Sequence, residues 1–120
     1  MKSEKVLELN ELNFESTVLE AKGPVLVDFT AEWCAPCRAL TPIVQQIADQ
    51  AAHVVVGSVD ADAHPNLASR YGVRGLPTLV VFVGGKEVAR RVGLTNADGI
   101  RRLLASVPER DGERRSSSPA

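Results

Sequence analysis

Residues 27–37 read VDFTAEWCAPC, and two different structural periods meet at this stretch. Around its start, the apolar residues of 25–29 barely alternate with polar ones, which predicts a strand buried on both faces. After it, apolar residues recur at helical spacing, at Leu40, Val44, Ile47, Ala48 and Ala51. We therefore expect a buried strand that leads directly into a helix, with Cys34 and Cys37 at the start of that helix.

Strand and helix patterns alternate on both sides of this stretch. Period-two or short apolar runs predict further strands at 6–9, 54–59, 78–83 and 86–92, with Gly84-Gly85 as a hairpin turn between the last two. Helical patterns are expected at 14–21 with Asn13 as the cap, at 65–71 before Gly72, and along a last stripe of Ile100, Leu103, Leu104 and Val107. This alternation predicts an α/β domain with a mixed sheet.

Length and charge limit the domain count and the classes of partner. The chain has 120 residues, enough for one well-cored domain, and 44% of them are hydrophobic. A net charge of -1, from 14 basic and 15 acidic residues, gives no electrostatic signal for nucleic acid or anionic lipid. We place the folded domain at 1–107. The remaining residues, PERDGERRSSSPA (108–120), have little to bury and predict a disordered tail.

No apolar run approaches the roughly 20 residues that a membrane-spanning helix needs. The first residues, Met-Lys-Ser-Glu-Lys, do not lead into the apolar stretch of a signal peptide. We therefore expect a cytoplasmic protein with no membrane partner.

The chain has only two cysteines, Cys34 and Cys37. A disulfide between them closes a very short loop and constrains the unfolded chain little, so redox activity or metal binding explains the pair better than a structural role. Unpaired N–H groups and the dipole at the helix start favour a thiolate at Cys34. Cys37 lies one turn further on the same face, and Pro36 suits the first turn because its missing N–H would be unpaired there.

These positions predict a thiol–disulfide exchange mechanism. The Cys34 thiolate attacks a substrate disulfide, and Cys37 then attacks Cys34 and releases the reduced substrate. Because Cys37 must lose a proton, a nearby base would help. Asp28 is the candidate, since burial in an apolar strand should raise its pKa toward neutrality.

Two separate segments closely resemble the signatures of the thioredoxin family. The first is the stretch 27–37 already quoted. The second is Arg74-Gly75-Leu76-Pro77-Thr78, where the family has a proline after a cis peptide bond opposite the dithiol. Tyr71-Gly72-Val73 and Val92-Gly93 also match, and the resemblance covers about residues 6–107.

The resemblance implies the thioredoxin fold, a five-stranded central mixed sheet flanked by four helices. It implies a reductase of protein disulfides that binds no cofactor, works through a redox-active Cys34–Cys37 disulfide and is recharged by an NADPH-dependent flavin reductase. By position, Cys34 is the nucleophile, Cys37 the resolving thiol and Asp28 the buried acid. The implied substrate-binding surface comprises Trp33, Ala35, Pro36, Leu76, Pro77 and Gly93.

Three positions depart from the family pattern. Ala35 stands where a glycine is common, and the residues between the cysteines influence the redox potential. Thr30 replaces a frequent second tryptophan. Ser58 replaces a lysine that often pairs with the buried acid, so Asp28 should hold its proton more tightly. These departures bear on the potential and the substrate range.

Other interpretations of the same residues remain open. The cysteines also fit plain buried residues or half of a zinc site, although His53 and His64 lie outside any ligand spacing with them. Trp33, Asp28 and Pro77, taken singly, also fit a core residue, a structural acid and an ordinary loop proline. A thiol oxidase or isomerase is a further alternative, as is a binding module with an incidental dithiol. Nothing in the sequence requires an oligomer, and we expect a monomer.

Overall fold

The computed structural model describes residues 5–107, and within them five strands form one mixed sheet. The sheet order is β1-β3-β2-β4-β5. The bounds are Val6–Leu9 for β1, Val25–Thr30 for β2, Val55–Asp60 for β3, Thr78–Val83 for β4 and Lys86–Val92 for β5. β1 and β2 both run parallel to β3, whereas β4 runs antiparallel to β2 and to β5. The five-stranded mixed sheet expected from the sequence is confirmed.

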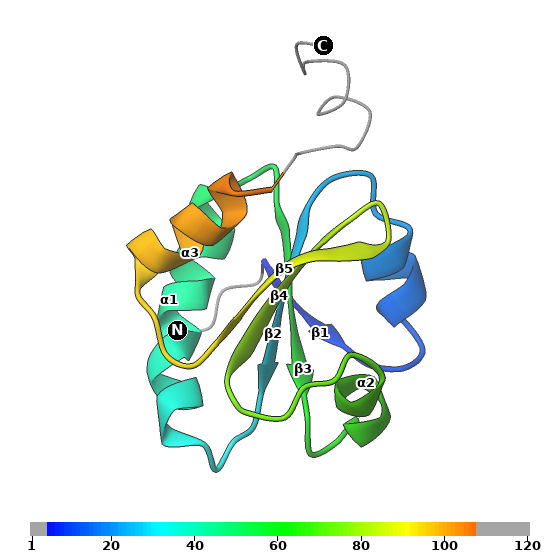
Figure 1. Cartoon of the computed structure of the whole chain (residues 1–120), viewed down its shortest axis with the longest axis vertical. Helices are drawn as coiled ribbons and strands as arrows, with labels where there is room; N and C mark the ends of the chain where they lie inside the picture. The colour runs from blue at the N-terminus through cyan, green and yellow to red at the C-terminus, as the bar shows by residue number, and fades with distance from the viewer. Residues whose placement is uncertain (1–4, 108–120) are drawn as a thin grey trace, which may run out of the picture.

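Four helices cover the two faces of this sheet. They are η1 (Glu15–Leu19), α1 (Ala35–Gln50), α2 (Pro65–Arg70) and α3 (Ala97–Ala105). Figure 1 shows α1 and α3 on one face, and α2 with the blue helix η1 on the other. The sheet therefore forms the middle layer of three.

Each face of the sheet has its own apolar core. Toward η1 and α2, Phe29 and Phe82 pack with Phe14, Val18 and Leu67. Toward α1 and α3, the core consists of residues from both helices and three strands: Leu26, Val56, Leu79, Val81, Leu40, Val44, Ile47 and Ile100. Because both faces are covered, every residue of β4 and the first five of β2 are buried. Each buried valine, leucine or phenylalanine side chain among them contributes roughly 1.5–3 kcal/mol to folding.

The strands predicted at 6–9, 78–83 and 86–92 are confirmed with their expected bounds, whereas β2 extends one residue beyond the expected 25–29, to Thr30. The third strand begins at Val55 and ends at Asp60, one residue later than the expected 54–59. Gly84 and Gly85 have φ values of 62° and 81°, so both occupy the left-handed region that a two-residue hairpin turn requires. Gly72, with φ 65°, likewise follows the end of α2.

The prediction for the first helix was wrong in length and in its cap. The helix is a short π-helical segment at Glu15–Leu19, and no side-chain cap closes its start. Asn13 is occupied elsewhere: its Oδ1 accepts from Asn10 N at 2.8 Å, and Asn10 Oδ1 accepts from Asn13 N at 2.9 Å. This reciprocal turn satisfies both carboxamide oxygens before the helix begins.

In the described part of the chain, no helix is long and apolar enough to cross a membrane. The expected boundary at residue 107 coincides with the end of the described residues, so the predicted tail at 108–120 lies outside them.

Candidate active site

The strand-to-helix junction places Cys34 as the N-cap of α1. β2 ends at Thr30, and Cys34 N donates to Ala31 O at 3.2 Å across the intervening turn. With φ -87° and ψ 110°, Cys34 is extended, as an N-cap residue should be. Its Sγ accepts a hydrogen bond from Cys37 N at 3.3 Å. A free N–H group of the first turn therefore points at the sulfur and would stabilise a thiolate there.

Cys34 and Cys37 form a disulfide in the structure. Their Cα atoms are 5.2 Å apart, within the usual range of about 4.4–6.8 Å. Cys37 is fully buried, whereas Cys34 retains 4% of its surface. Pro36 lies in the first turn of α1, as expected. Cys34 is thus the more accessible residue of the pair.

A loop from the other half of the domain lies against the dithiol. Leu76 packs on the small cluster formed by Ala31, Cys34 and Cys37, and the Leu76–Pro77 peptide bond is cis. The resemblance implied this cis bond. Thr78 Oγ1 donates to Gly75 O at 2.6 Å and closes the turn before β4. The sheet thereby brings segments about 40 residues apart in sequence to one end of the molecule.

Gly93 connects this loop to the end of β5. Its N–H donates to Pro77 O at 2.8 Å, and its φ is 99°. No described heavy atom lies within 4 Å of the position that a Cβ would take. A residue with a side chain would be strained by the backbone conformation and would project into open space beside Pro77.

Trp33 lies on the surface beside the dithiol. It is 67% exposed, so the core interpretation does not hold. Its indole Nε1 donates to Asp62 Oδ2, in the segment that follows β3. This contact anchors the ring, which exposes apolar surface next to Cys34.

Two residues near the dithiol were not predicted from the sequence. Asp62 is the partner of Trp33, and Arg38 donates through Nη1 to Glu32 O at 2.6 Å, which ties the loop before Cys34 to the first turn of α1. Nothing in the local sequence pattern marks either contact. Only the spacing of Arg38, one residue after Cys37, offered a signal that it would lie near the site.

Asp28 lies in the middle of β2 and is 3% exposed. Burial raises its pKa from 3.8 to about 7, in agreement with the expected direction. Its register partner on β3 is Ser58, so the two side chains point to the same face of the sheet. Oδ1 of Asp28 has no hydrogen-bond partner among the described residues. Desolvation by burial is the cause of the raised pKa.

A metal site finds no support in the geometry. Among residues 5–107, no group of three or more His, Cys, Asp or Glu side chains is arranged to hold a metal ion. His64 Nδ1 instead lies 2.7 Å from Glu11 Oε1. The redox-active group is the disulfide of the protein itself.

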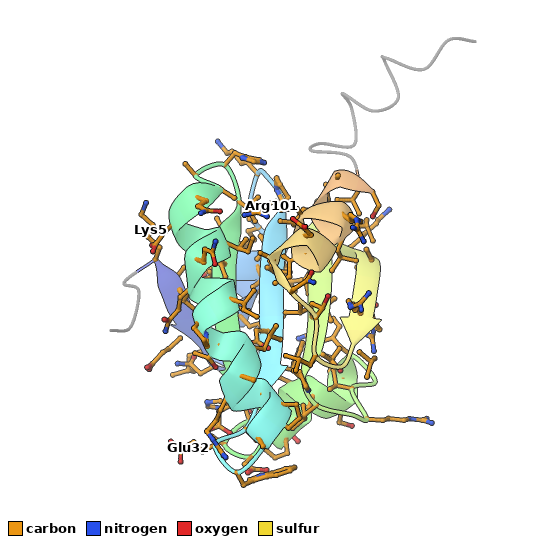
Figure 2. The ribbon with its side chains drawn as sticks, turned by 90° about the vertical axis from the view of Figure 1, so that its left-hand side faces the viewer. Lys5, Glu32 and Arg101 are labelled. Carbon is orange, nitrogen blue, oxygen red and sulfur yellow. A yellow bond between two sulfur atoms is a disulfide. The ribbon has the colours of Figure 1, made fainter. Side chains whose placement is uncertain are left out.

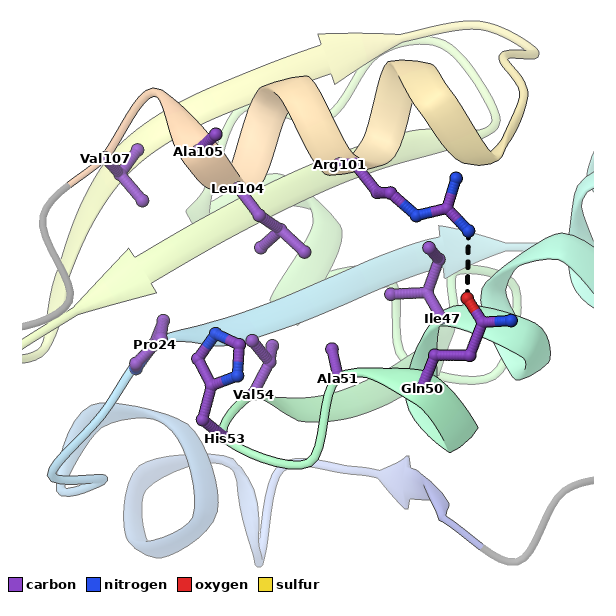
Figure 3. Close-up of a pocket in the computed structure, with 10 residues that line it drawn as sticks. All are labelled: Pro24, Ile47, Gln50, Ala51, His53, Val54, Arg101, Leu104, Ala105 and Val107. Atoms are coloured by element: carbon purple, nitrogen blue, oxygen red, sulfur yellow. Dashed lines mark hydrogen bonds between the residues drawn. The ribbon is translucent and has the colours of Figure 1, made fainter.

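The dithiol lies at one end of α1, and a separate cavity lies at the other end. Glu32 lies near its start, at the dithiol end, and Arg101 lies near its other end (Figure 2). There Arg101 Nη2 donates to Gln50 Oε1 at 2.9 Å beside a cavity of about 400 Å³ between α1 and α3 (Figure 3). Aliphatic residues form much of that lining, including Ile47, Val54 and Leu104, and neither cysteine borders it.

Comparisons with known proteins agree with this geometry. A family model described as Thioredoxin matches residues 5–106. The thioredoxin of Chlamydia caviae is 47% identical over 92 residues, which are 77% of this chain and 88% of that protein. The thioredoxin of Buchnera aphidicola is 46% identical over 90 residues, 74% of this chain and 83% of that protein.

The similarity extends to three dimensions. A solved mutant thioredoxin from Halobacterium salinarum superimposes with a TM-score of 0.79 at 36% sequence identity. The match covers 90% of this chain and 98% of that one. The family model spans both the dithiol segment and the loop with the cis bond.

Proposed function

The chain belongs to the thioredoxin family and is a thioredoxin-type dithiol–disulfide reductase. We propose that Cys34 is its nucleophile and that Cys37 is its resolving thiol. The observation that carries these roles is the N-cap geometry. The Cys34 sulfur accepts from a first-turn N–H and Cys34 as a residue retains some exposure, whereas Cys37 is fully buried. A sulfur so placed is the better thiolate and belongs to the more accessible residue.

The proposed reaction begins from the reduced dithiol. The Cys34 thiolate attacks one sulfur of a client disulfide, which breaks the client S–S bond and expels the other client sulfur as a thiolate. Cys37 then loses its proton and attacks Cys34 Sγ, and the second client sulfur leaves. Two electrons pass to the client, and the protein is left with the Cys34–Cys37 disulfide that the structure contains.

Asp28 is proposed to accept the proton that Cys37 releases. A carboxyl group with a pKa of about 7 exchanges protons readily near neutral pH, whereas an ordinary aspartate would stay ionised. Its position on the strand that leads into the dithiol turn supports this role.

The partners of the protein include client proteins that carry disulfides. We propose that client backbone binds across the surface made by Trp33, Ala35, Pro36, Leu76, Pro77 and Gly93. The open space beside Gly93 and the exposed ring of Trp33 support this placement. We also propose a monomer that works in the cytoplasm, where such dithiols are kept reduced, and that an NADPH-dependent flavin reductase recharges it.

Cysteine variants test the proposed roles. Cys34→Ser should abolish turnover of a disulfide client, because no nucleophile remains. Cys37→Ser should accumulate mixed disulfides with clients, because Cys34 still attacks but nothing resolves the adduct. Non-reducing electrophoresis and mass spectrometry measure both. Normal client release from Cys37→Ser would refute the assignment of the resolving thiol.

The direction of electron flow is tested by the reduction potential. We expect the Cys34/Cys37 couple to equilibrate well below the cytosolic glutathione poise of roughly -220 to -260 mV. Equilibration in defined dithiothreitol or glutathione buffers measures it, and Ala35→Gly in the same buffers isolates the effect of the extra methyl group. A potential above the glutathione poise would contradict the reductant assignment while leaving the exchange chemistry intact.

A further inference from the structure

A polar cavity of about 390 Å³ lies on the α1 side of the sheet, separate from the dithiol groove proposed for clients. We call it the Asp28 cavity. Residues of β1, β2, β3 and α1 line it, together with the loops that follow β1, β2 and β3. Its acidic and hydroxyl-bearing lining residues are Glu8, Asp28, Glu32, Asp60, Thr30 and Ser58, with Thr41 contributed by α1.

The sign of the charge around this cavity selects the class of ligand. Four carboxyl-bearing residues line it, whereas no lysine or arginine does. The one remaining titratable lining group is His64, whose Nδ1 already lies 2.7 Å from Glu11 Oε1. The α1 residues in the lining carry no charge. An anion would be repelled from such a lining, and a cation would be attracted.

An unpaired carboxylate oxygen at the buried end of the cavity independently indicates a ligand. Asp28 is 3% exposed and borders the cavity, and its Oδ1 has no hydrogen-bond partner among the described residues. Buried carboxylate oxygens are normally hydrogen-bonded, because an unpaired one loses its hydration without compensation. A ligand with N–H donors would supply the missing bond and the missing positive charge together.

The volume of the Asp28 cavity favours an organic cation over a metal ion as its ligand. A volume of about 390 Å³ falls in the range of about 300–1,000 Å³ typical of small-molecule sites, far above the roughly 10–15 Å³ that one water needs. The described residues also contain no group of three or more metal-ligating acids, histidines or cysteines. The acceptors are therefore spread along the cavity and do not converge on a single point.

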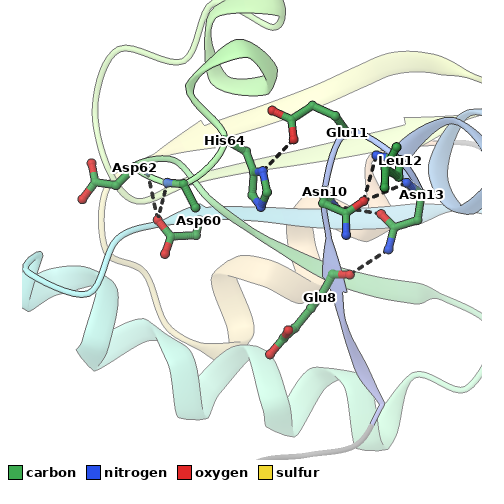
Figure 4. Close-up of polar contacts among 9 residues, drawn as sticks. Glu8, Asn10, Glu11, Leu12, Asn13, Asp60, Asp62 and His64 are labelled. Carbon is green, nitrogen blue, oxygen red and sulfur yellow. Dashed lines mark hydrogen bonds and ion pairs between the residues drawn. The ribbon is translucent and has the colours of Figure 1, made fainter.

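Local contacts fix the loops that border the cavity (Figure 4). Asp60 Oδ1 accepts from Asp62 N at 2.9 Å and from Ala63 N at 3.2 Å. On the opposite border, Asn10 Oδ1 accepts from Leu12 N at 2.8 Å and from Asn13 N at 2.9 Å. The Glu11–His64 contact joins the two loops. A cavity framed in this way needs little rearrangement to take a ligand.

We propose that the Asp28 cavity binds a linear aliphatic diamine in its doubly protonated form. One ammonium group donates to Asp28 Oδ1 at the buried end, and the alkyl chain passes Val44 and the aliphatic stem of Gln45. The second ammonium group meets the carboxylates at the solvent-exposed end, where Glu32 is exposed and Asp60 half-buried. Binding neutralises the buried carboxylate and so couples the ligand to the ionisation of Asp28.

Titration of the full chain with 1,4-diaminobutane tests this proposal. Calorimetry and amide chemical shifts monitor the binding. We expect one molecule to bind, with shifts concentrated at Asp28, Ser58 and Asp60. Because alkylammonium groups keep their protons near neutrality while Asp28 ionises around pH 7, affinity should rise about tenfold between pH 6 and pH 8. 1-Butylamine, which has the same length but one charge, should bind at least tenfold more weakly.

Variants separate this site from general attraction to acidic surface. Asp28→Asn should abolish the tenfold rise between pH 6 and pH 8, because the carboxyl group that ionises in this range is then absent. Ser58→Lys should abolish binding, because its own ammonium group would extend from the register partner of Asp28 into the cavity. Glu20→Gln removes one exposed carboxylate outside the cavity and should bind as the wild type does.

Three outcomes would overturn the proposal. They are equal affinity for 1-butylamine, undiminished binding to Ser58→Lys in a variant that circular dichroism shows to be folded, and displacement of the diamine by Mg²⁺ at equal ionic strength. Diamine binding is measured without any redox step. A negative result would therefore leave the proposed cysteine roles untouched, and a failed cysteine assignment would leave the cavity's ligand unaffected.

Discussion

At the scale of single residues, Asp28 and Cys34 show how position changes the chemistry of ordinary side chains. Cys34 is suited to hold a thiolate because it caps α1 directly after the turn that follows β2, so that Cys37 N points at its sulfur. Asp28 becomes a near-neutral acid because a strand covered on both faces removes its water. Neither effect needs a cofactor, since both arise from backbone placement and burial.

The raised pKa of Asp28 predicts a specific pH dependence of stability. Below pH 4 the carboxyl is protonated in the folded and the unfolded chain. Between about pH 4 and pH 7 the unfolded chain releases the proton while the folded protein retains it. The free energy of unfolding should therefore fall through this window, by at most roughly 4 kcal/mol, and level off above it.

Asp28→Asn should remove this component, so its stability relative to wild type should increase from pH 4 to pH 7. Urea unfolding at several pH values measures the difference. Asp98→Asn, which changes an exposed carboxylate paired with Arg101, is the matched control and should show no comparable trend. A constant offset between Asp28→Asn and wild type would contradict the raised pKa.

At the scale of elements, the register of β1 against β3 depends on a glycine. A Cβ at Gly57 would lie 2.5 Å from Leu9 Cδ1, and Leu9 is only 3% exposed. Gly57 therefore lets the Leu9 side chain lie over β3, which fixes the N-terminal strand in the core. The close approach explains why a glycine occurs in a strand at this position.

Gly57→Ala should destabilise the protein by about 1–3 kcal/mol through overpacking. Gly23→Ala, where the added Cβ would meet His53 O at an ordinary 3.6 Å, should change stability little. Combining Gly57→Ala with Leu9→Ala makes room for the methyl group, so the two effects should be strongly non-additive. Denaturant unfolding measures all four variants, and strict additivity would show that Leu9 is not the residue that resists the methyl group.

The elements near the dithiol were largely predictable from sequence, because periodicity and turn residues are local signals. The step from the run at 25–29 to the stripe beginning at Leu40 located both β2 and α1. Asn13 was assigned wrongly, since its carboxamide pairs with Asn10 rather than with a helix start. The Trp33–Asp62 contact spans 29 residues, and no local pattern specifies which acid a tryptophan will meet across such a distance.

Some parts of the site were predictable from the sequence and others were not. Cys34, Cys37 and the cis Leu76–Pro77 bond followed from two short motifs, and the structure brings them together. The Asp28 cavity did not follow from sequence, because its lining comes from three strands, one helix and three loops. A cavity is a property of what side chains leave unfilled, and that depends on the complete packing arrangement.

At the scale of the whole molecule, the described helices and strands pack as one domain, and α3 is the last element among the described residues. The family model also ends at residue 106. We propose that residues 1–107 suffice for folding and activity. Truncation after Val107 should leave the thermal midpoint and the rate of client reduction unchanged, as measured by calorimetry and a disulfide-reduction assay. A lower midpoint or rate would assign the last 13 residues of the 120-residue chain a role in the domain.

The two outer strands of the sheet limit which chains can add to its edges. β1 has only four residues, and β5 carries Lys86, Glu87, Arg90 and Arg91 along an edge with mostly exposed side chains. Short length and charge both discourage strand addition, by which an unpaired sheet edge captures extended peptide or a second copy of itself. The flanks of the sheet thus discourage the capture of extended chain, from a client protein or from a second copy, and with it the start of a growing β-aggregate.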